Sequence, residues 1–282
     1  MFSIKNKLFN LLLRIYRPVF EELRCKVAYD TQRSIATALL HQKTFAEFRN
    51  KYVGKEVVLV GAGPTLNQFV PVQGAIYVGL NRAFLYNKVH FDYLFTIDKA
   101  GLDLPDEALY EKFFSYNAVK FVGDQNLGPN YQIPCSKFAN VPDVRLYKTT
   151  AGWLPDRFLY DIDSQPLANS SSCSIQAMQF ILFTNPRKIY LVGIDCTCGM
   201  KGHFTGTDFD AASRAEDAVG NNTYVIDSWK NLKEFARTYY PETEIISVNP
   251  IGLKGIFTDV YTESYLKEHP EIDPKTVQIL GK

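Results

Sequence analysis

The sequence predicts an α/β protein whose sheet is doubly wound and mostly parallel, with helices on both faces. Short continuous apolar runs are typical of strands buried in a parallel sheet. Such runs occur at residues 57–60, 75–80, 93–97, 119–122, 189–192 and 244–248. Helical patterns separate the later runs, at residues 174–184 and 228–240. Because alternating strands and helices are joined by right-handed crossovers, we expect a Rossmann-like sheet with a ligand crevice at the carboxyl ends of its strands.

The first fifty residues follow a different pattern. Apolar residues recur at helical spacing up to about Asn50, with a plausible break at Asp30-Thr31-Gln32. We therefore expect two parts: an N-terminal amphipathic helical extension at residues 1–50 and a Rossmann-like domain at residues 51–282.

The start of this extension is basic. Its first acidic residue is Glu21, and the basic residues before it are Lys5, Lys7, Arg14 and Arg17. A basic amphipathic helix is typical of segments that lie on an anionic membrane surface. The alternative is a helix that packs on the domain or on a second copy of the chain, which would give a homo-oligomer.

Composition and charge narrow the class of protein. The 282 residues include 31 Lys and Arg and 30 Asp and Glu, so the net charge of +1 argues against nucleic acid as a partner. No apolar stretch approaches the roughly 20 residues of a membrane span. Five irregularly spaced cysteines favour a reducing cytoplasm over a secreted disulfide framework. They are Cys25, Cys135, Cys173, Cys196 and Cys198.

A glycine-rich turn, Gly61-Ala62-Gly63-Pro64, follows the first apolar run and precedes a helix predicted to start near Pro64. Glycines let a ligand approach the backbone, and a helix N-terminus offers N–H groups to a phosphate. Thr65 adds a hydroxyl. The NAD fingerprint is not met because Leu66 holds the position of its third glycine, and no P-loop Gly-Lys-Ser/Thr follows. A purely structural turn remains the alternative.

Polar side chains also end the five later runs. They are Asn81, Asp98, Asp124, Asp195 and Asn249. Any one of them would serve as a helix cap, but together they surround the expected crevice. A serine run at residues 169–174 opens a predicted helix, so one member is expected to be its N-cap. Its neighbours, Ser171 and Ser172 among them, could bind a phosphate or a ribose.

A second glycine-rich segment at residues 198–206 is expected to be a mobile lid, because it follows Asp195 directly. His203 in this segment is the best candidate for a general acid or base, and a surface histidine without a role is the alternative. Zinc bound by Cys196, Cys198 and His203 is disfavoured, because zinc ligands usually have a wider spacing and no fourth ligand is evident.

Two Asp-x-Asp patterns, at residues 161–163 and 208–210, have the ligands that Mg²⁺ prefers. Neither pattern follows a clear strand, so we interpret both as solvated loop acids. We therefore expect no bound metal and no cofactor.

Three stretches together carry a family resemblance. "VLVGAGPTLN", "GLNRAF" and "SSSCSIQAMQFILFTNPRKIYLVGID" resemble the bacterial sialyltransferases of glycosyltransferase family 42. They also resemble the wider group of motility-associated-factor glycosyltransferases and hydroxymethylpterin pyrophosphokinase. The resemblance covers roughly Lys55 to Phe257. It implies a Rossmann-like fold and, as in the sialyltransferases, a CMP-sugar donor, an inverting reaction and no metal requirement.

Position by position, the resemblance implies that Gly61, Ala62 and Gly63 hold the CMP, with Ala62 where those sialyltransferases have an asparagine. Asn81 matches their next nucleotide-contacting asparagine. Asn249-Pro250 falls near their segment around the base.

The sequence departs from the family pattern at the residues that carry the chemistry. Thr197 and His203 stand where those sialyltransferases place tyrosines on the leaving phosphate. Their catalytic histidine precedes the next helix, a region that reads Asn221-Asn222-Thr223-Tyr224 here. By hypothesis, His203 supplies the missing function.

The leading hypothesis is a glycosyltransferase in bacterial surface glycan synthesis. The domain at 51–282 would bind a nucleotide sugar, with a glycan or lipid-linked acceptor as the second substrate. The protein would be cytoplasmic or peripheral at the inner face of the membrane. The expected catalytic residues are His203 and Asp195. The expected nucleotide-binding residues are Gly61, Ala62, Gly63, Pro64, Thr65, Asn81, Asp98, Ser171, Ser172, Thr197 and Asn249.

Two alternatives stay open. ATP- and Mg²⁺-dependent phosphoryl or pyrophosphoryl transfer would require paired carboxylates such as Asp98 and Asp195. A catalytically inactive nucleotide-binding subunit would bind ligand without turnover.

Overall fold

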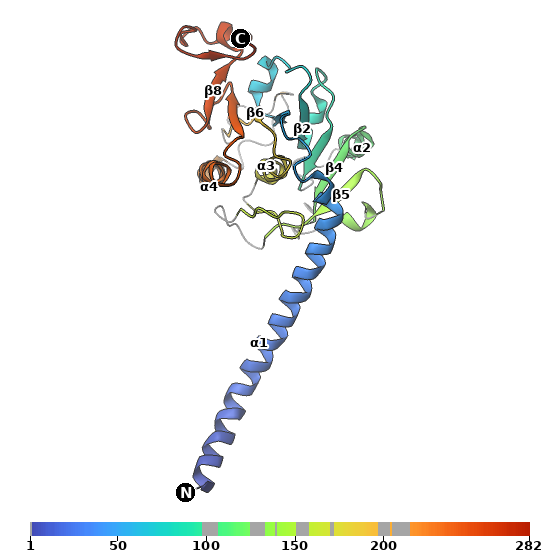
Figure 1. The fold of residues 1–282 in the computed structure, drawn as a ribbon, viewed down its shortest axis with the longest axis vertical. Coiled ribbons are helices and arrows are strands. Elements are labelled where there is room, and N and C mark those ends of the chain that lie inside the picture. The colour runs from blue at the N-terminus through green and yellow to red at the C-terminus, as the bar shows by residue number, and fades with distance from the viewer. Residues whose placement is uncertain are drawn as a thin grey trace.

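The computed structural model describes residues 2–97, 107–124, 133–138, 140–150, 158–169, 172–196, 204 and 215–282. These residues form a nine-stranded sheet in the order β5-β4-β3-β2-β1-β6-β7-β8-β9, and every neighbouring pair is parallel (Figure 1). Helices lie on both faces. The predicted α/β, doubly wound class is therefore confirmed.

The elements have the following bounds. The strands are β1 Glu56–Val60, β2 Ile76–Leu80, β3 Tyr93–Thr96, β4 Val119–Gly123, β5 Val144–Tyr147, β6 Lys188–Val192, β7 Glu244–Val248, β8 Thr258–Tyr261 and β9 Gln278–Ile279. The α-helices are α1 Phe2–Phe45, α2 Glu107–Ser115, α3 Cys173–Phe183, α4 Ala215–Tyr239 and α5 Glu263–Glu268. Short 3-10 helices are η1 Ala46–Phe48, η2 Pro64–Gln68, η3 Asn81–Leu85 and η5 Cys135–Phe138.

All six apolar runs form strands. The helix predicted near Pro64 is present only as a short 3-10 helix, not as an α-helix. The chain after β1 makes only the five-residue 3-10 helix η2, and the chain after β2 makes another, η3.

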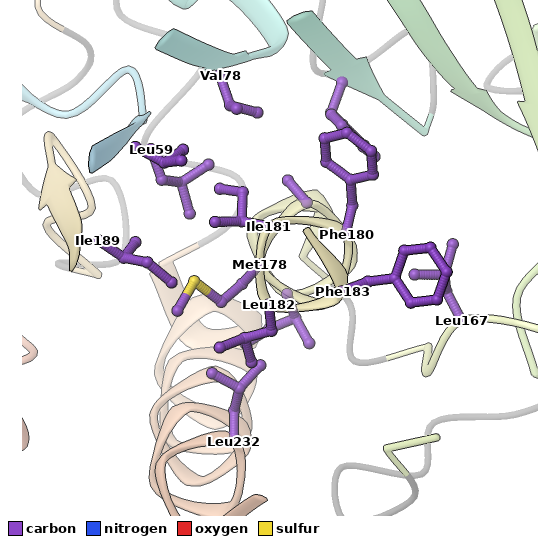
Figure 2. Close-up of a cluster of buried hydrophobic side chains, with 14 of the residues drawn as sticks. Leu59, Val78, Leu167, Met178, Phe180, Ile181, Leu182, Phe183, Ile189 and Leu232 are labelled. Atoms are coloured by element: carbon purple, nitrogen blue, oxygen red, sulfur yellow. The ribbon is translucent and has the colours of Figure 1, made fainter. Parts of the chain in front are cut away.

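The two faces of the sheet pack against different elements. Alternate residues of β1 divide the core, because successive side chains of a strand point to opposite faces. Val57 and Leu59 contact the cluster built on α3 and α4, whereas Val58 and Val60 contact the cluster that contains η2, η3 and α2. Every residue of α3 is buried. Figure 2 shows α3 between side chains of the sheet and Leu232 of α4.

The predicted break at 30–32 is wrong, because α1 is one continuous helix. The hydroxyl of Thr31 donates to the carbonyl of Val27 at 2.8 Å, and that of Ser34 donates to the carbonyl of Asp30 at 2.9 Å. These bonds within the helix accommodate the polar stretch. Most of α1 projects from the body of the molecule (Figure 1). Among the described residues, no helix has both the length and the apolarity needed to cross a bilayer.

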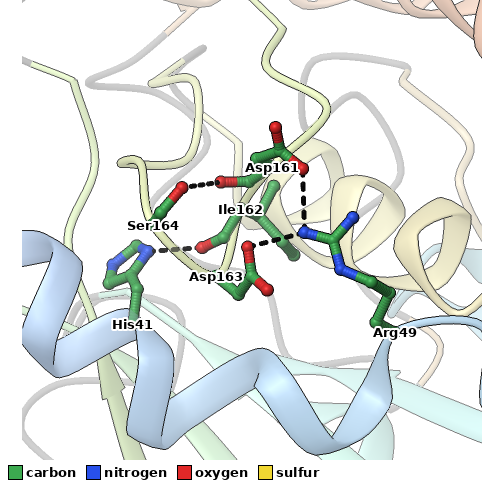
Figure 3. Close-up of polar contacts among 6 residues, drawn as sticks. All are labelled: His41, Arg49, Asp161, Ile162, Asp163 and Ser164. Carbon is green, nitrogen blue, oxygen red and sulfur yellow. Dashed lines mark hydrogen bonds and ion pairs between the residues drawn. The ribbon is translucent and has the colours of Figure 1, made fainter.

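The last turns of α1 belong to the core and are held by polar bonds. The Nδ1 of His41 lies 2.7 Å from the carbonyl oxygen of Ile162 (Figure 3). The Nε2 of His41 accepts from the N–H of Lys148 at 2.8 Å. Thr44 donates to the carbonyl of Leu146 at 2.7 Å. Phe45 is fully buried. His41 must therefore be neutral, with its proton on Nδ1, to make both bonds.

This arrangement predicts an acid-sensitive fold. Burial lowers the pKa of His41 below its ordinary value of 6.5. Below pH 6.5 the unfolded chain therefore takes up a proton that the folded chain does not, and stability falls as the pH decreases. We expect urea unfolding of the wild type to show this loss between about pH 7 and pH 5. His41→Ala should cost about 2 kcal/mol at neutral pH and should weaken the pH dependence. An unchanged pH dependence in that variant would contradict this role.

The Asp161–Asp163 pair is not an open metal site. Both carboxylates accept bonds of 2.8 Å from Arg49, whose guanidinium also lies 4.6 Å from the ring centre of Phe183 (Figure 3). These acids anchor their loop to the residues that follow α1, so they are paired with Arg49 rather than solvated loop acids.

Candidate nucleotide-binding site

The strand order reverses between β1 and β6, where the sequence predicts a ligand crevice. The chain runs from β1 outward to β5 and then returns to β6, which pairs with β1 on its other side. In doubly wound sheets, ligands bind at the carboxyl ends of the strands at such a point. The turn after β1 and Asp195 after β6 lie on the two sides of this point.

The two turns touch through their glycines. A Cβ atom on Gly61 would lie 2.4 Å from the carbonyl oxygen of Gly193, and one on Gly63 would lie 2.4 Å from Oδ2 of Asp195. Gly193 itself has a φ of +63°. Real Cβ atoms do not approach other atoms this closely, so the junction of β1 and β6 requires glycine at residues 61 and 63.

Backbone hydrogen bonds between the two turns engage the N–H groups of both glycines, Gly61 and Gly63. The N–H of Gly61 donates to the carbonyl of Val192 at 2.8 Å, and that of Gly63 donates to the carbonyl of Gly193 at 2.9 Å. Ala62 is partly exposed, and its N–H has no acceptor among the described residues. The glycines therefore fix the shape of the turn, and the N–H of Ala62 is its available donor for a ligand.

Asp195 accepts two hydrogen bonds from Thr65, the residue that follows this turn. Its carboxylate accepts from the N–H of Thr65 at 3.1 Å and, in a short bond, from the Thr65 hydroxyl. Asp195 is 5% exposed, and burial raises the pKa of its carboxyl group. The geometry supports a positioning role for Asp195. A role in proton transfer stays a prediction.

Asn81 follows β2 and has a φ of +49°, a left-handed conformation that asparagine tolerates. Its Oδ1 atom is buried and has no donor among the described residues. The register pairs Val60 at the end of β1 with Gly79 of β2 and Val192 of β6, so the turn that contains Ala62 and the residue Asn81 follow the ends of adjacent strands. A buried carbonyl oxygen without a donor suits a ligand hydroxyl or amino group.

Asn249 has a structural partner. It follows β7, which is not the last strand, because β8 and β9 extend the sheet beyond it. Its Nδ2 donates to the hydroxyl of Thr262 at 3.1 Å, and its Oδ1 accepts from the N–H of Thr262 at 2.9 Å. The Thr262 hydroxyl also donates to the carbonyl of Gln68. Asn249 thus links the end of β7 to the start of α5 and to η2.

The predicted cap of α3 is confirmed. Ser172 is the N-cap residue, and its hydroxyl oxygen accepts from the N–H of Ser174 at 3.4 Å.

The Asn221-Asn222-Thr223-Tyr224 segment lies inside α4, so the expectation that it precedes a helix is wrong. Asp124 is paired with Lys148 at 2.5 Å and is thus already engaged.

Several predicted site residues lie outside the described residues. They are Asp98, Ser171, Thr197, Cys198, His203 and the 208–210 pair. Phe204, which follows His203 in the sequence, is described. Its N–H donates to the carbonyl of Ala62 at 2.9 Å, and its carbonyl accepts from the Nδ2 of Asn67 at 3.1 Å. Within the described part of the chain, no three His, Cys, Asp or Glu side chains are grouped to hold a metal ion.

Sequence reasoning did not single out Arg82 or Gly252. Arg82 follows Asn81 directly, and its side chain is buried, at 1% exposed. Gly252 packs on the backbone after β6, where a Cβ would lie 2.6 Å from the carbonyl oxygen of Cys196. The Asn-Arg pair directly after an apolar run was a local signal for Arg82. No local signal marks Gly252, because its neighbour is more than fifty positions away.

Neither a protein-family model nor a curated protein matches the chain. Among solved structures, the MAf glycosyltransferase from Magnetospirillum magneticum AMB-1 is similar at 15% identity and a TM-score of 0.45. That match covers 81% of this chain, which spans only 39% of the other. The sialyltransferase CstII from Campylobacter jejuni, in complex with the substrate analogue CMP-3FNeuAc, is similar at 15% identity and a TM-score of 0.41. Here 68% of this chain matches 80% of the other. These are the two kinds of glycosyltransferase that the three sequence stretches resemble.

Proposed function

We propose that the chain is a glycosyltransferase that binds a nucleotide-activated sugar, of the CMP-sugar class, where β1 and β6 meet. The observation that carries the proposal is the buried Oδ1 of Asn81, which has no donor among the described residues and follows the strand next to β1. A nucleotide offers hydrogen-bond partners for both the Oδ1 of Asn81 and the N–H of Ala62. Its ribose hydroxyls and base amino group are donors for Asn81, and its phosphate oxygens are acceptors for the N–H of Ala62.

The proposed reaction is a displacement at the anomeric carbon. The acceptor hydroxyl oxygen forms a bond to that carbon, the bond from the carbon to the phosphate oxygen breaks, and its electron pair leaves with CMP. The acceptor proton passes to a base, for which His203 is the proposed residue. The N–H of Ala62 donates to the departing phosphate in this proposal, because a fixed donor stabilises the negative charge that develops there.

The CMP-sugar class and the setting come from the sequence resemblance. We propose a glycan or lipid-linked acceptor in bacterial surface glycan synthesis, with the enzyme on the cytoplasmic side of the membrane. No metal or cofactor is part of this proposal.

Thermal-shift measurements with CMP, CDP, UDP, GDP and ATP, each with and without Mg²⁺, test the nucleotide class. A ligand at 100 times its dissociation constant stabilises the folded chain by about 2.7 kcal/mol. We expect CMP to raise the melting temperature without metal. A shift with ATP and Mg²⁺ alone would replace this proposal with phosphoryl transfer. A CMP shift without turnover of any CMP-sugar would support an inactive binding subunit.

Asn81→Ala is expected to weaken CMP binding about tenfold, because it removes one ligand hydrogen bond. Isothermal titration of CMP into the wild type and the variant would measure this loss. Asn87→Ala is the matched control, since Asn87 is an exposed asparagine that follows the same short helix. Equal loss in both variants, or none in Asn81→Ala, would contradict the assignment of Asn81 to the site.

A further inference from the structure

The first half of α1 exposes a broad apolar surface. Seven of its described side chains are large, apolar and between 43% and 69% exposed. They are Phe9, Leu11, Leu12, Leu13, Tyr16, Val19 and Phe20. At about 100° per residue they cover about 200° of the helix circumference. Large apolar surfaces in water generally mark a binding surface.

The rest of the circumference is basic. Lys7, Arg14 and Arg17 lie on the arc that these apolar side chains leave free, together with Asn6 and Asn10. Residues 2–20 contain four basic and no acidic residues, with Lys5 as the one basic residue outside this arc. A wide apolar face opposite a basic face is the pattern of a helix that lies in the plane of a bilayer surface with anionic headgroups.

The second half of the projecting helix has neither property. Residues 21–36 contain three acidic and three basic residues. Their exposed apolar side chains are sparser: Leu23, Val27 and Tyr29 lie on the same arc as the apolar residues 9–20, and Ile35 lies outside it. Packing into the body begins at Thr37, which is 8% exposed. This part spans about 24 Å.

We infer that residues 2–20 bind an anionic membrane surface in its plane and that residues 21–36 are a spacer that holds the sheet domain off the bilayer. Pro18 lies near the junction. Its ring removes the N–H that would bond to the carbonyl of Arg14, so a bend at this point costs less than elsewhere in the helix. The spacer gives the strand-end crevice access to an acceptor that stands above the headgroups.

A second copy of the chain is the competing partner. Alternating steps of four and three residues, the spacing of a two-helix seam, connect exposed apolar residues from 9 to 27. They are Phe9, Leu13, Tyr16, Phe20, Leu23 and Val27. Such a seam would leave Leu11, Leu12 and Val19 in water, whereas a bilayer takes up all seven apolar side chains. The flanking positions also carry no acid to pair with Arg17 across a seam. The observations therefore favour the membrane.

The test is co-sedimentation of the full chain with vesicles, which needs no enzymatic readout and is independent of the proposed transferase activity. We expect binding to mixed phosphatidylcholine–phosphatidylglycerol vesicles, weak binding to phosphatidylcholine alone, and a loss of binding at high salt. Arg14→Glu with Arg17→Glu should lower the partition coefficient at least about twenty-fivefold, because each basic residue lost near the surface costs a factor of about five.

Leu12→Glu with Val19→Glu separates the two partners, because both positions lie on the apolar face but off the seam. Membrane binding predicts a loss of more than about tenfold for this pair. The matched control, Tyr29→Glu with Ile35→Glu, changes two exposed apolar residues of the spacer and should retain binding. Failure of the wild type to bind anionic vesicles would overturn the inference, as would equal losses in both pairs. Concentration-dependent dimers without vesicle binding would assign the surface to a second copy.

Discussion

Gly61→Ala is expected to lower the free energy of unfolding by about 3 kcal/mol and the melting temperature by roughly 6–12 °C. The added Cβ would lie 2.4 Å from the carbonyl oxygen of Gly193, a backbone atom. That oxygen also accepts the N–H of Gly63, so it cannot move away without breaking the junction of β1 and β6. The change should also weaken CMP binding, since it displaces the N–H of Ala62.

Gly74→Ala is the matched control for this prediction. Gly74 has a φ of +72°, and a Cβ there would meet no atom of the described residues within 4 Å. The control should therefore cost only about 1 kcal/mol, the cost of a left-handed conformation. Guanidinium unfolding of both variants measures the difference. If Gly61→Ala were no less stable than Gly74→Ala, the close contact between the two turns would be wrong.

The central strands could be predicted from the sequence because each is buried on both faces, which makes it a continuous apolar run. The outer strands could not. The β5 sequence Val-Arg-Leu-Tyr carries a charge in its middle, β8 begins Thr-Asp, and β9 has only two residues. Strands near a sheet edge bury fewer side chains, so their sequences carry a weaker apolar signal.

The candidate site was predictable in position but not in detail. The glycine turn and Asn81 follow strands, and a parallel sheet brings all its strand ends to one edge. The sequence does not reveal that Asp195 bonds to Thr65, a residue 130 positions away. It also does not reveal that the carbonyls of Val192 and Gly193 accept the N–H groups of Gly61 and Gly63. Both facts depend on the register of β1 against β6, which no local pattern specifies.

Asp195→Ala is expected to lower the free energy of unfolding by about 2–3 kcal/mol, because it leaves the N–H and hydroxyl of buried Thr65 without acceptors. Asp195→Asn should behave differently. The asparagine oxygen can accept from the N–H of Thr65, and its amide can donate to the Thr65 hydroxyl. The positioning role therefore predicts that Asn preserves both the turn and the turnover, whereas Ala loses both.

The pH dependence of stability separates both variants from the wild type. Burial raises the pKa of Asp195, so the folded chain binds a proton more tightly than the unfolded chain does. Stability from this group therefore falls as the pH rises from the ordinary pKa of aspartate through the raised value, and the cost remains at neutral pH. Asp195→Asn removes that cost and should be at least as stable as the wild type at neutral pH. Denaturant unfolding of the wild type, Asp195→Ala and Asp195→Asn, from the ordinary pKa of aspartate up to neutral pH, measures these differences in stability. A stable Asp195→Asn variant with turnover reduced by about a hundredfold or more would instead show that the carboxylate itself transfers a proton or contacts the substrate.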